Sequence, residues 1–556
     1  MRLVNRKMAA CGLVALLLLG SCGGAGPERN SIDSEESEVP SPKMARLYLN
    51  SDGGSGALYA NGPPITPDQV CRVVNELEGT QVDVFIQCAS YGTYVLYDTQ
   101  VGEVYGRGMT EFENPNFGRL AQNVLGLLEQ GTDPLEIWAA RTHELGMKFW
   151  ASLRMNDIHK DWVDRWPSKR GRWERERPHV AIGKDVPDRY VSLYGRDFSY
   201  AFDYARQEVR DLKFGLVEEI CRDYDVDGIE LDFLSHPMVF RKGQEEAGMP
   251  IMTGFVRRIR DRLEEIGRRK GRRITLMVRV LPTVGLNREI GFDVVTWIRE
   301  GLVDVIAPAT RGYLDMNPDL ASFVEAARGT QVQVLGGISD LYVRDYTGSK
   351  TGRASPEMMR AAAQSFWGQG VSGLHLFNFD CHASGIQGHS AVNSLIDTSR
   401  QPLLSPEERQ MLTEIGDPEL ISRKDKHYFI TRDMAGRTPE EGGEMQLPVD
   451  LDEDRERILR LFVGDDVEAA SQDGVLESLR LVVSLSANSR WDDDLRLVLN
   501  GRRLRGEMGN GRLRFENAPV RQGLNELTIR LRRRGGRGPL QPVRVQGVEV
   551  FIDYRM

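Results

Sequence analysis

Short apolar runs alternate with amphipathic stretches from residue 45 to about residue 380. The runs lie at 45–50, 82–90, 148–156, 227–234, 274–281, 303–310, 332–338 and 373–380. The stretches between them carry a helical period, as from Pro134 to Gly146, where Asp133 precedes the first turn as a capping residue. Strands that alternate with helices form parallel sheets. Eight such strands predict an α/β fold, a (β/α)8 TIM barrel.

The pattern changes near residue 431, where alternating strands follow one another without clear helices. These strands lie at 479–486, 494–500, 511–519, 525–533 and 543–554, and Asn-Gly turns separate some of them. The pattern predicts a β-sandwich, similar to the jelly-roll modules often appended to glycosidases. We therefore expect a barrel over 44–395, a connector over 396–430 and an accessory sandwich over 431–556.

The N-terminal residues have the features of an export signal. Three basic residues precede an apolar run at 8–19, which is too short to span a bilayer as a stable helix. The segment Leu19-Gly20-Ser21-Cys22 resembles the bacterial lipobox. Residues 1–22 are therefore expected to be a lipoprotein signal with Cys22 lipidated, followed by a flexible tether over 23–43. Gly23 favours the outer membrane as the site of the anchor, and an ordinary secretory signal is the alternative.

Net charge and cysteine content limit which binding partners, metals and disulfides we expect. The net charge of −9 speaks against a nucleic-acid partner. Four of the six cysteines lie beyond the signal, at positions 71, 88, 221 and 381, with no paired CxxC spacing. A zinc site is therefore not expected, and neither is any other metal or cofactor. Buried free thiols are favoured over a disulfide, because Cys88 and Cys221 occupy apolar contexts.

The run Asp227–Pro237 holds the strongest chemical signal. Strand side chains alternate between faces, so Glu230 and Asp232 share one face, while the apolar residues between them share the other. Both carboxylates should then project into the barrel, with Asp232 near the carboxyl end of the strand. Buried acids must be paired or belong to a site. For Glu230 the structural alternative is a salt bridge from Arg154 or Arg279 on neighbouring strands.

Other polar side chains are expected at the same strand ends, where active sites of these barrels are built. The candidates for substrate binding are Gln87, Arg154, Asn156, His159, Trp162, His236, Arg279 and Asn378. Trp162 belongs to a long connection over 157–203 that is rich in tryptophan and arginine. Tryptophan stacks on sugar rings and arginine pairs with carboxylate or sulfate, so this loop favours a carbohydrate substrate that carries anionic groups. A solvated charged insert is the alternative.

The segment YDVDGIELDFLSHP, with KFWASLRMND at the preceding strand, resembles the glycosyl-hydrolase-like 10 group of bacterial barrel proteins. The resemblance covers about residues 45–390 and implies hydrolysis of a polysaccharide or oligosaccharide. Family 10 xylanases differ, because they carry Asn-Glu at the fourth strand and a nucleophilic Glu at the seventh, which VQVLGGISD lacks. Chitinase-like barrels end the fourth strand in Asp-x-Glu. Neither catalytic pair is therefore carried over.

Glycoside hydrolysis generally requires two carboxyls, about 5–5.5 Å apart for retention and about 6.5–9.5 Å for inversion. Glu230 and Asp232 lie roughly 7 Å apart on one strand and would approach a sugar from the same side. We therefore expect Asp232 to be the nucleophile or electrostatic stabiliser. The general acid should come from another strand end, with Asp157, Asp340 and Asp380 as candidates. Glu230 would tune the pKa of Asp232 by repulsion.

Two other classes of function stay open at this point. A glycan-binding lipoprotein with a degenerate site would keep the aromatic loop and the sandwich but lack a second carboxyl at catalytic distance. A metal-dependent barrel hydrolase would need histidine or carboxylate clusters on the early strands. The first strand, ARLYLN, has none.

Overall fold

The computed structural model describes residues 44–51, 55–112, 115–157, 170–187, 198–310, 312–339, 353–379, 402–432, 446–452, 455–486, 495–531 and 543–555. The chain separates into residues 1–44 and residues 45–556. Cys22 and the expected tether lie outside the described residues. Within the described ranges, no helix has the length and apolar character needed to cross a membrane.

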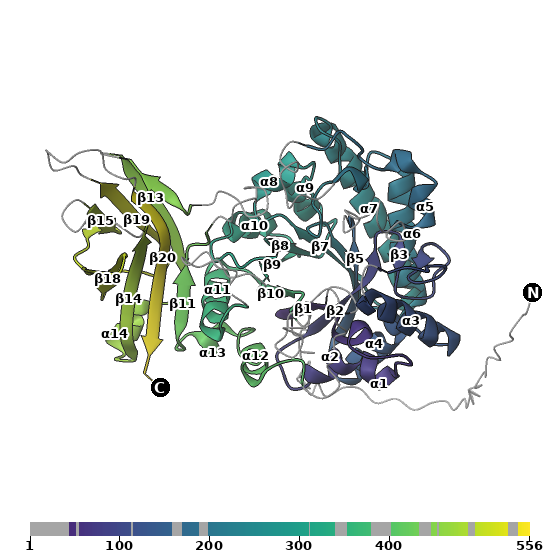
Figure 1. The fold of residues 1–556 in the computed structure, drawn as a ribbon, viewed down its shortest axis with the longest axis horizontal. Coiled ribbons are helices and arrows are strands. Elements are labelled where there is room, and N and C mark those ends of the chain that lie inside the picture. The colour runs from purple at the N-terminus through teal and green to yellow at the C-terminus, as the bar shows by residue number, and fades with distance from the viewer. Residues whose placement is uncertain are drawn as a thin grey trace, which may run out of the picture. The chain divides into compact units, whose positions relative to one another are not determined.

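The barrel consists of parallel strands that close on themselves (Figure 1). They are β1 (Leu47–Ser51), β2 (Val84–Tyr91), β5 (Lys148–Arg154), β6 (Gly228–Asp232), β7 (Thr275–Val280), β8 (Val305–Pro308), β9 (Gln333–Ile338) and β10 (Gly373–Phe377). Each strand pairs in parallel with its neighbour, and β1 closes the ring by pairing with both β10 and β2. The predicted TIM barrel is confirmed.

Helices surround the ring of strands (Figure 1). They are α1 (Pro67–Val70), α2 (Arg72–Glu76), α3 (Pro115–Glu129), α4 (Pro134–Glu144), α5 (Arg172–Arg175), α6 (Gln207–Asp223), α7 (Glu245–Lys270), α8 (Val284–Glu289), α9 (Val294–Arg299), α10 (Leu320–Ala327), α11 (Pro356–Gly368), α12 (Pro406–Leu412) and α13 (Pro418–Ile421). Asp133 caps α4 by accepting a hydrogen bond from the Glu136 amide, and Ser355 caps α11 in the same way. A short extension follows β2: β3 (Tyr94–Val95) pairs antiparallel with β2, and β4 (Glu103–Val104) pairs in parallel with β3.

Two apolar layers hold the barrel together. The outer layer lies between the strands and the helices. The inner layer fills part of the barrel interior with Tyr48, Val84, Ile86, Trp150, Met277, Val305, Ala307 and Leu335. Gly228 is required beside this inner layer, because a Cβ there would lie 2.7 Å from the Trp150 ring.

The C-terminal part is the predicted β-sandwich of antiparallel strands. One sheet runs β11 (Lys426–Phe429), β20 (Val543–Tyr554), β14 (Leu476–Leu485), β18 (Arg512–Glu516), β17 (Glu507–Gly509), with β12 (Val449–Leu451) also on β20. The other runs β13 (Glu456–Val463), β19 (Gly523–Leu531), β15 (Leu495–Leu499), β16 (Arg502–Arg503), and α14 (Val467–Gln472) follows β13. Strand β11 lies in the stretch expected to be a connector, and its pairing with β20 places it in the sandwich.

Candidate active site

Strand β6 directs both of its carboxylates into the barrel, as its alternation predicts. Glu230 contacts side chains from β1, β5 and β10, and Asp232 contacts a side chain from β7. Only interior positions can reach such distant strands, because outward side chains meet the helices. The two acids therefore occupy successive levels of the interior, with Asp232 nearer the carboxyl ends of the strands.

The lower level is a closed cluster around Glu230. Oε1 of Glu230 accepts hydrogen bonds from Nδ2 of Asn50 at 2.7 Å and from Oγ of Ser152 at 2.5 Å. Oε2 lies 2.8 Å from Nε2 of His375. None of these four residues is more than 1% exposed. The cluster joins four strands, and this arrangement suits an anchor of the barrel core; a catalytic role for Glu230 stays a prediction.

The structural alternative for Glu230, a salt bridge from Arg154 or Arg279, is not what holds this acid. Both arginines lie one level higher, because β6 and its neighbours pair Arg154 with Asp232 and Asp232 with Arg279 in register. Arg279 consequently forms its salt bridge with Asp232, and Arg154 forms its salt bridge with Asp157. The partners that hold Glu230 are neutral or titratable side chains instead of guanidinium groups.

Asp232 is the centre of the upper level. It is 1% exposed, and its Oδ1 accepts hydrogen bonds from Nη1 of Arg279 at 3.0 Å and from the amides of Leu234 at 3.0 Å and Ser235 at 3.1 Å. Donors of this kind, one of them a cation, stabilise the charged form of a carboxylate. The chain turns sharply after β6 to provide the two amides, so the loop itself orients the acid.

A second ion pair ends strand β5. Nη1 of Arg154 lies 2.9 Å from Oδ2 of Asp157, and both residues are buried. The Arg154 guanidinium also lies over the Tyr91 ring at 4.8 Å. From behind the strand, the buried ammonium of Lys213 donates to the Arg154 carbonyl at 2.8 Å. The end of β5 is therefore held from both sides, and Asp157 has a cationic partner.

Two further predicted binding residues brace the loops. Oδ1 of Asn156 accepts from the Phe202 amide at 2.8 Å, and its Nδ2 donates to the carbonyls of Phe202 and Met238. His236 is fully buried, with Nδ1 3.4 Å from Oγ of Ser235 and from the Asn156 carbonyl. The structure thus brings Asn156 and His236 together. These contacts fix the path of the chain after β5 and β6.

Gln87 is not brought to this group. It lies two positions from Phe85 and from Ala89 and so shares their outward face, which packs in the outer apolar layer. Its Nε2 donates to the carbonyls of Ser51 and Cys88. Asn378 follows β10 in a left-handed conformation, with φ of 59°, and its amide donates to the Asn50 carbonyl at 2.7 Å. Asn378 therefore lies beside β1 at the correct end of the barrel.

Several predicted residues lie outside the described ranges. They are His159, Trp162, Asp340 and Asp380. The structure adds three interior residues that the sequence reasoning missed: Asn50, Ser152 and Phe377. The available signal was parity, because each lies two positions from another inward residue on its strand, namely Tyr48, Trp150 and His375.

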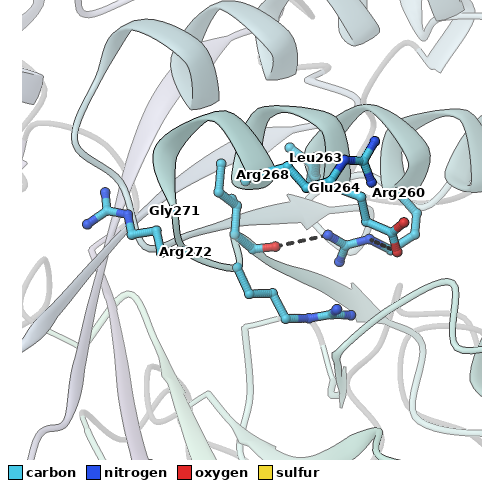
Figure 2. A pocket seen from close by; sticks show the side chains of 9 residues that line it. Arg260, Leu263, Glu264, Arg268, Gly271 and Arg272 are labelled. Carbon is cyan, nitrogen blue, oxygen red and sulfur yellow. Dashed lines mark hydrogen bonds and ion pairs between the residues drawn. The ribbon is translucent and has the colours of Figure 1, made fainter. Parts of the chain in front are cut away.

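A hollow of about 520 Å³ lies away from these residues, between the end of α7 and the start of β7. Figure 2 shows Arg260 and Glu264 side by side within it. Its arginines are largely paired: Arg260 and Arg273 with Asp304, and Arg272 with Asp225. Basic residues at the end of a helix also complement the helix dipole. The hollow is therefore explained by the structure of the barrel.

The described cysteines are buried free thiols, as predicted, at Cys71, Cys88 and Cys221. Burial raises the pKa of Cys71 to about 11 and that of Cys221 to about 12, so both are poor nucleophiles. Cys381 lies outside the described residues. In the described part of the chain, no three His, Cys, Asp or Glu side chains are grouped as metal ligands would be.

No family model and no curated protein matches the sequence. Solved structures similar to the chain include an Anoxybacillus alpha-amylase, with 10% identity, 88% of this chain and 99% of that chain covered, and a TM-score of 0.40. An alpha-L-fucosidase from Paenibacillus thiaminolyticus has 12% identity, 92% and 100% coverage, and a TM-score of 0.40. A β-L-arabinopyranosidase from Geobacillus stearothermophilus has 12% identity, 87% and 97% coverage, and a TM-score of 0.36. Similarity at this level carries no argument about activity, so the function is argued from the side chains.

Proposed function

We propose that this chain is a glycoside hydrolase that acts on a polysaccharide or oligosaccharide through carboxylate chemistry at the barrel mouth. The observation that carries the proposal is Asp232, a buried carboxylate that accepts a hydrogen bond from a guanidinium group at the carboxyl end of a barrel strand. Arg279 and two loop amides orient it. Active sites of TIM barrels lie at this end of the strands. The resemblance of the β6 segment to glycosyl-hydrolase-like barrels supports the same reading.

In this mechanism Asp232 is the nucleophile or the stabiliser of the oxocarbenium-like transition state. Its partners keep it charged, which suits either role and does not suit a general acid. Glu230 is less suited, because its two oxygens are already occupied by Asn50, Ser152 and His375 at the level below.

The general acid must be protonated before it acts, and this requirement separates the candidates. The salt bridge with Arg154 favours the charged form of Asp157, which suits a base. We therefore expect Asp340 or Asp380 to supply the acid. In the sequence, Asp340 follows β9 and Asp380 follows β10, and these barrel strands are not neighbours of β6 in the ring.

The decisive variant is Asp232→Asn, tested with purified protein against a panel of neutral and acidic polysaccharides. Asn retains an oxygen that accepts from the Leu234 and Ser235 amides, so the fold should persist while the charge is lost. We expect turnover per folded molecule to fall by about 10³-fold or more, and the melting temperature to fall as well, because the buried Arg279 loses its countercharge. Asp450→Asn, on an exposed sandwich strand, is the matched control and should leave turnover unchanged.

Turnover at the wild-type level in Asp232→Asn would refute the assignment of Asp232 as a catalytic carboxylate. A glycan-binding role without catalysis would appear in the same experiment as binding by the wild-type protein with no products from any polysaccharide.

We also propose that a lipid on Cys22 anchors the protein to the outer membrane, and this proposal has its own test. Cys22→Ser should abolish incorporation of labelled fatty acid and release the protein from the outer membrane fraction.

A further inference from the structure

Arg279 is an enclosed cation that uses only part of its hydrogen-bonding capacity. It is 0% exposed, and Nη1 donates to Oδ1 of Asp232 at 3.0 Å. Its Nε and Nη2 are buried and have no hydrogen-bond partner in the described chain. Buried donors are almost always paired in native proteins, and an unpaired donor on a charged group is especially unfavourable. The two free nitrogens therefore point to a missing acceptor.

The free nitrogens form one edge of the guanidinium group. Nε and Nη2 carry parallel N–H bonds, and this edge matches the two oxygens of a carboxylate or sulfate. A neutral hydroxyl can accept from only one of these donors at a time with good geometry. The shape of the unused edge thus favours a planar or tetrahedral oxyanion as the missing acceptor.

The guanidinium plane is fixed before any ligand arrives. Its central carbon lies 3.4 Å from the centre of the Phe377 ring on β10. The interior position of β8 that lies in register with Arg279 is Ala307, whose side chain is small. Phe377 on one side and Asp232 at Nη1 hold the guanidinium group in place. Binding of a ligand would therefore cost little conformational entropy of the Arg279 side chain.

The charges at this level also permit an anion. The two described cations, Arg154 and Arg279, are matched by Asp157 and Asp232. A ligand anion would bind at Nε and Nη2 of Arg279, on the edge that Asp232 does not use, since Asp232 binds Nη1.

We propose that the Nε–Nη2 edge of Arg279 binds the carboxylate or sulfate of an acidic sugar, which makes the substrate an anionic glycan. This proposal rests on the proposed function, because it locates the sugar beside Asp232. Arg279 then serves two anions, the substrate group and the catalytic carboxylate. It would fix the distance between the sugar ring and Asp232.

The test measures binding directly, so that it does not depend on turnover. Isothermal titration of the full-length protein compares D-glucuronate, its methyl ester, glucose 6-sulfate and D-glucose. We expect one of the two anionic sugars to bind at least about tenfold more tightly than the methyl ester and glucose, and the better one identifies carboxylate or sulfate. Equal binding of acid, ester and neutral sugar would overturn the proposal.

Arg279→Lys keeps the charge and the partner of Asp232 but removes the two-pronged edge. We expect it to weaken binding of the preferred anion by about 10- to 100-fold and to leave glucose binding unchanged. Arg514→Lys, on sandwich strand β18, is the matched control and should change neither. Unaltered anion binding by Arg279→Lys would also overturn the proposal.

Phe377→Leu provides a second route if Arg279→Lys does not fold. Loss of the ring frees the guanidinium, so anion binding should weaken by about threefold to tenfold without a change in charge. Unaltered anion binding in this variant contradicts the proposal. Asp232→Asn separates the two claims: it should abolish turnover yet still bind the anion. If anions bind and nothing is hydrolysed by the wild-type protein, the proposed function fails while this inference stands.

Discussion

The barrel mouth and the core of the sandwich both bury charges inside β structure, and they treat them differently. In the sandwich, Nζ of Lys426 lies 2.8 Å from Oδ1 of Asp465 and also donates to two backbone carbonyls. The hydroxyls of Tyr428 and Tyr554 donate to the two oxygens of Asp465. At the barrel mouth, by contrast, Arg279 keeps two buried donors without a partner in the described chain.

The difference separates a structural network from a site. A closed network satisfies every member and contributes to a single stable arrangement. An open network retains unsatisfied groups at a cost in stability, and such groups concentrate where a ligand completes them. The Glu230 cluster is intermediate, because its acid is satisfied while Oδ1 of Asn50 and Nδ1 of His375 are not.

The largest effect is expected from opening the sandwich network. Asp465→Asn leaves the Lys426 charge buried without a countercharge, since burial already lowers the pKa of Lys426 and Asp465 opposes that shift. The free energy of unfolding should fall by about 3–5 kcal/mol in urea titrations. Turnover per folded molecule should not change. A loss below about 1 kcal/mol would show that the pair contributes little.

The Glu230 cluster should respond to the loss of its acceptors. Glu230→Ala leaves Asn50 and Ser152 without their acceptor, and we expect a loss of about 2–4 kcal/mol in unfolding free energy. Glu230→Gln retains one carbonyl oxygen and should lose clearly less. Unlike Asp465→Asn, both variants should also lower turnover, because the cluster supports the strand that carries Asp232. Equal stability of the two variants would argue against the hydrogen bonds as the cause.

A pH dependence is expected where the barrel meets the sandwich. The Asp315 carboxyl accepts from the Asn317 amide and from Oγ1 of Thr431, and burial raises its pKa from 3.8 to about 6. The folded state therefore binds this proton more tightly than the unfolded state. The stabilisation is complete below pH 3.8 and is lost as pH rises through 6, on the order of 3 kcal/mol.

Asp315→Asn removes this titration, so its unfolding free energy should change less between pH 4 and pH 6 than that of the wild-type protein. Asp319→Asn is the control, because this exposed helix cap should leave the slope unchanged. Thermal melts across the interval give the comparison. Parallel curves for wild type and Asp315→Asn would contradict the assignment.

The smallest effect is expected from Ser152→Ala. The hydroxyl donates to Glu230 at 2.5 Å, and its loss leaves that carboxylate with Asn50 and His375. Unfolding free energy should fall by about 1 kcal/mol, measured by urea titration. A change as large as that of Glu230→Ala would show that Ser152 alone holds the cluster together.

The eight barrel strands were predictable because each is a short apolar run with a helix after it. The direction of the Gln87 side chain and the place of β11 in the sandwich were not predictable. Strands of a parallel barrel are buried on both faces, so an apolar run such as that of β2 does not tell which residues point inward. The sequence therefore could not show that Gln87 faces the helices. β11 is only four residues long, and its pairing with β20 is a tertiary contact.

The amino-acid sequence alone determined the order of strands and helices and the common face of Glu230 and Asp232, because both follow from local periodicity. Only the tertiary structure decided that Arg279 pairs with Asp232 instead of Glu230, since the register between β6 and β7 sets which side chains share a level. It likewise brought Phe377 from β10 against Arg279. The contact between Arg279 and Phe377 joins residues nearly a hundred positions apart, and no local pattern encodes the closure of the ring that makes them neighbours.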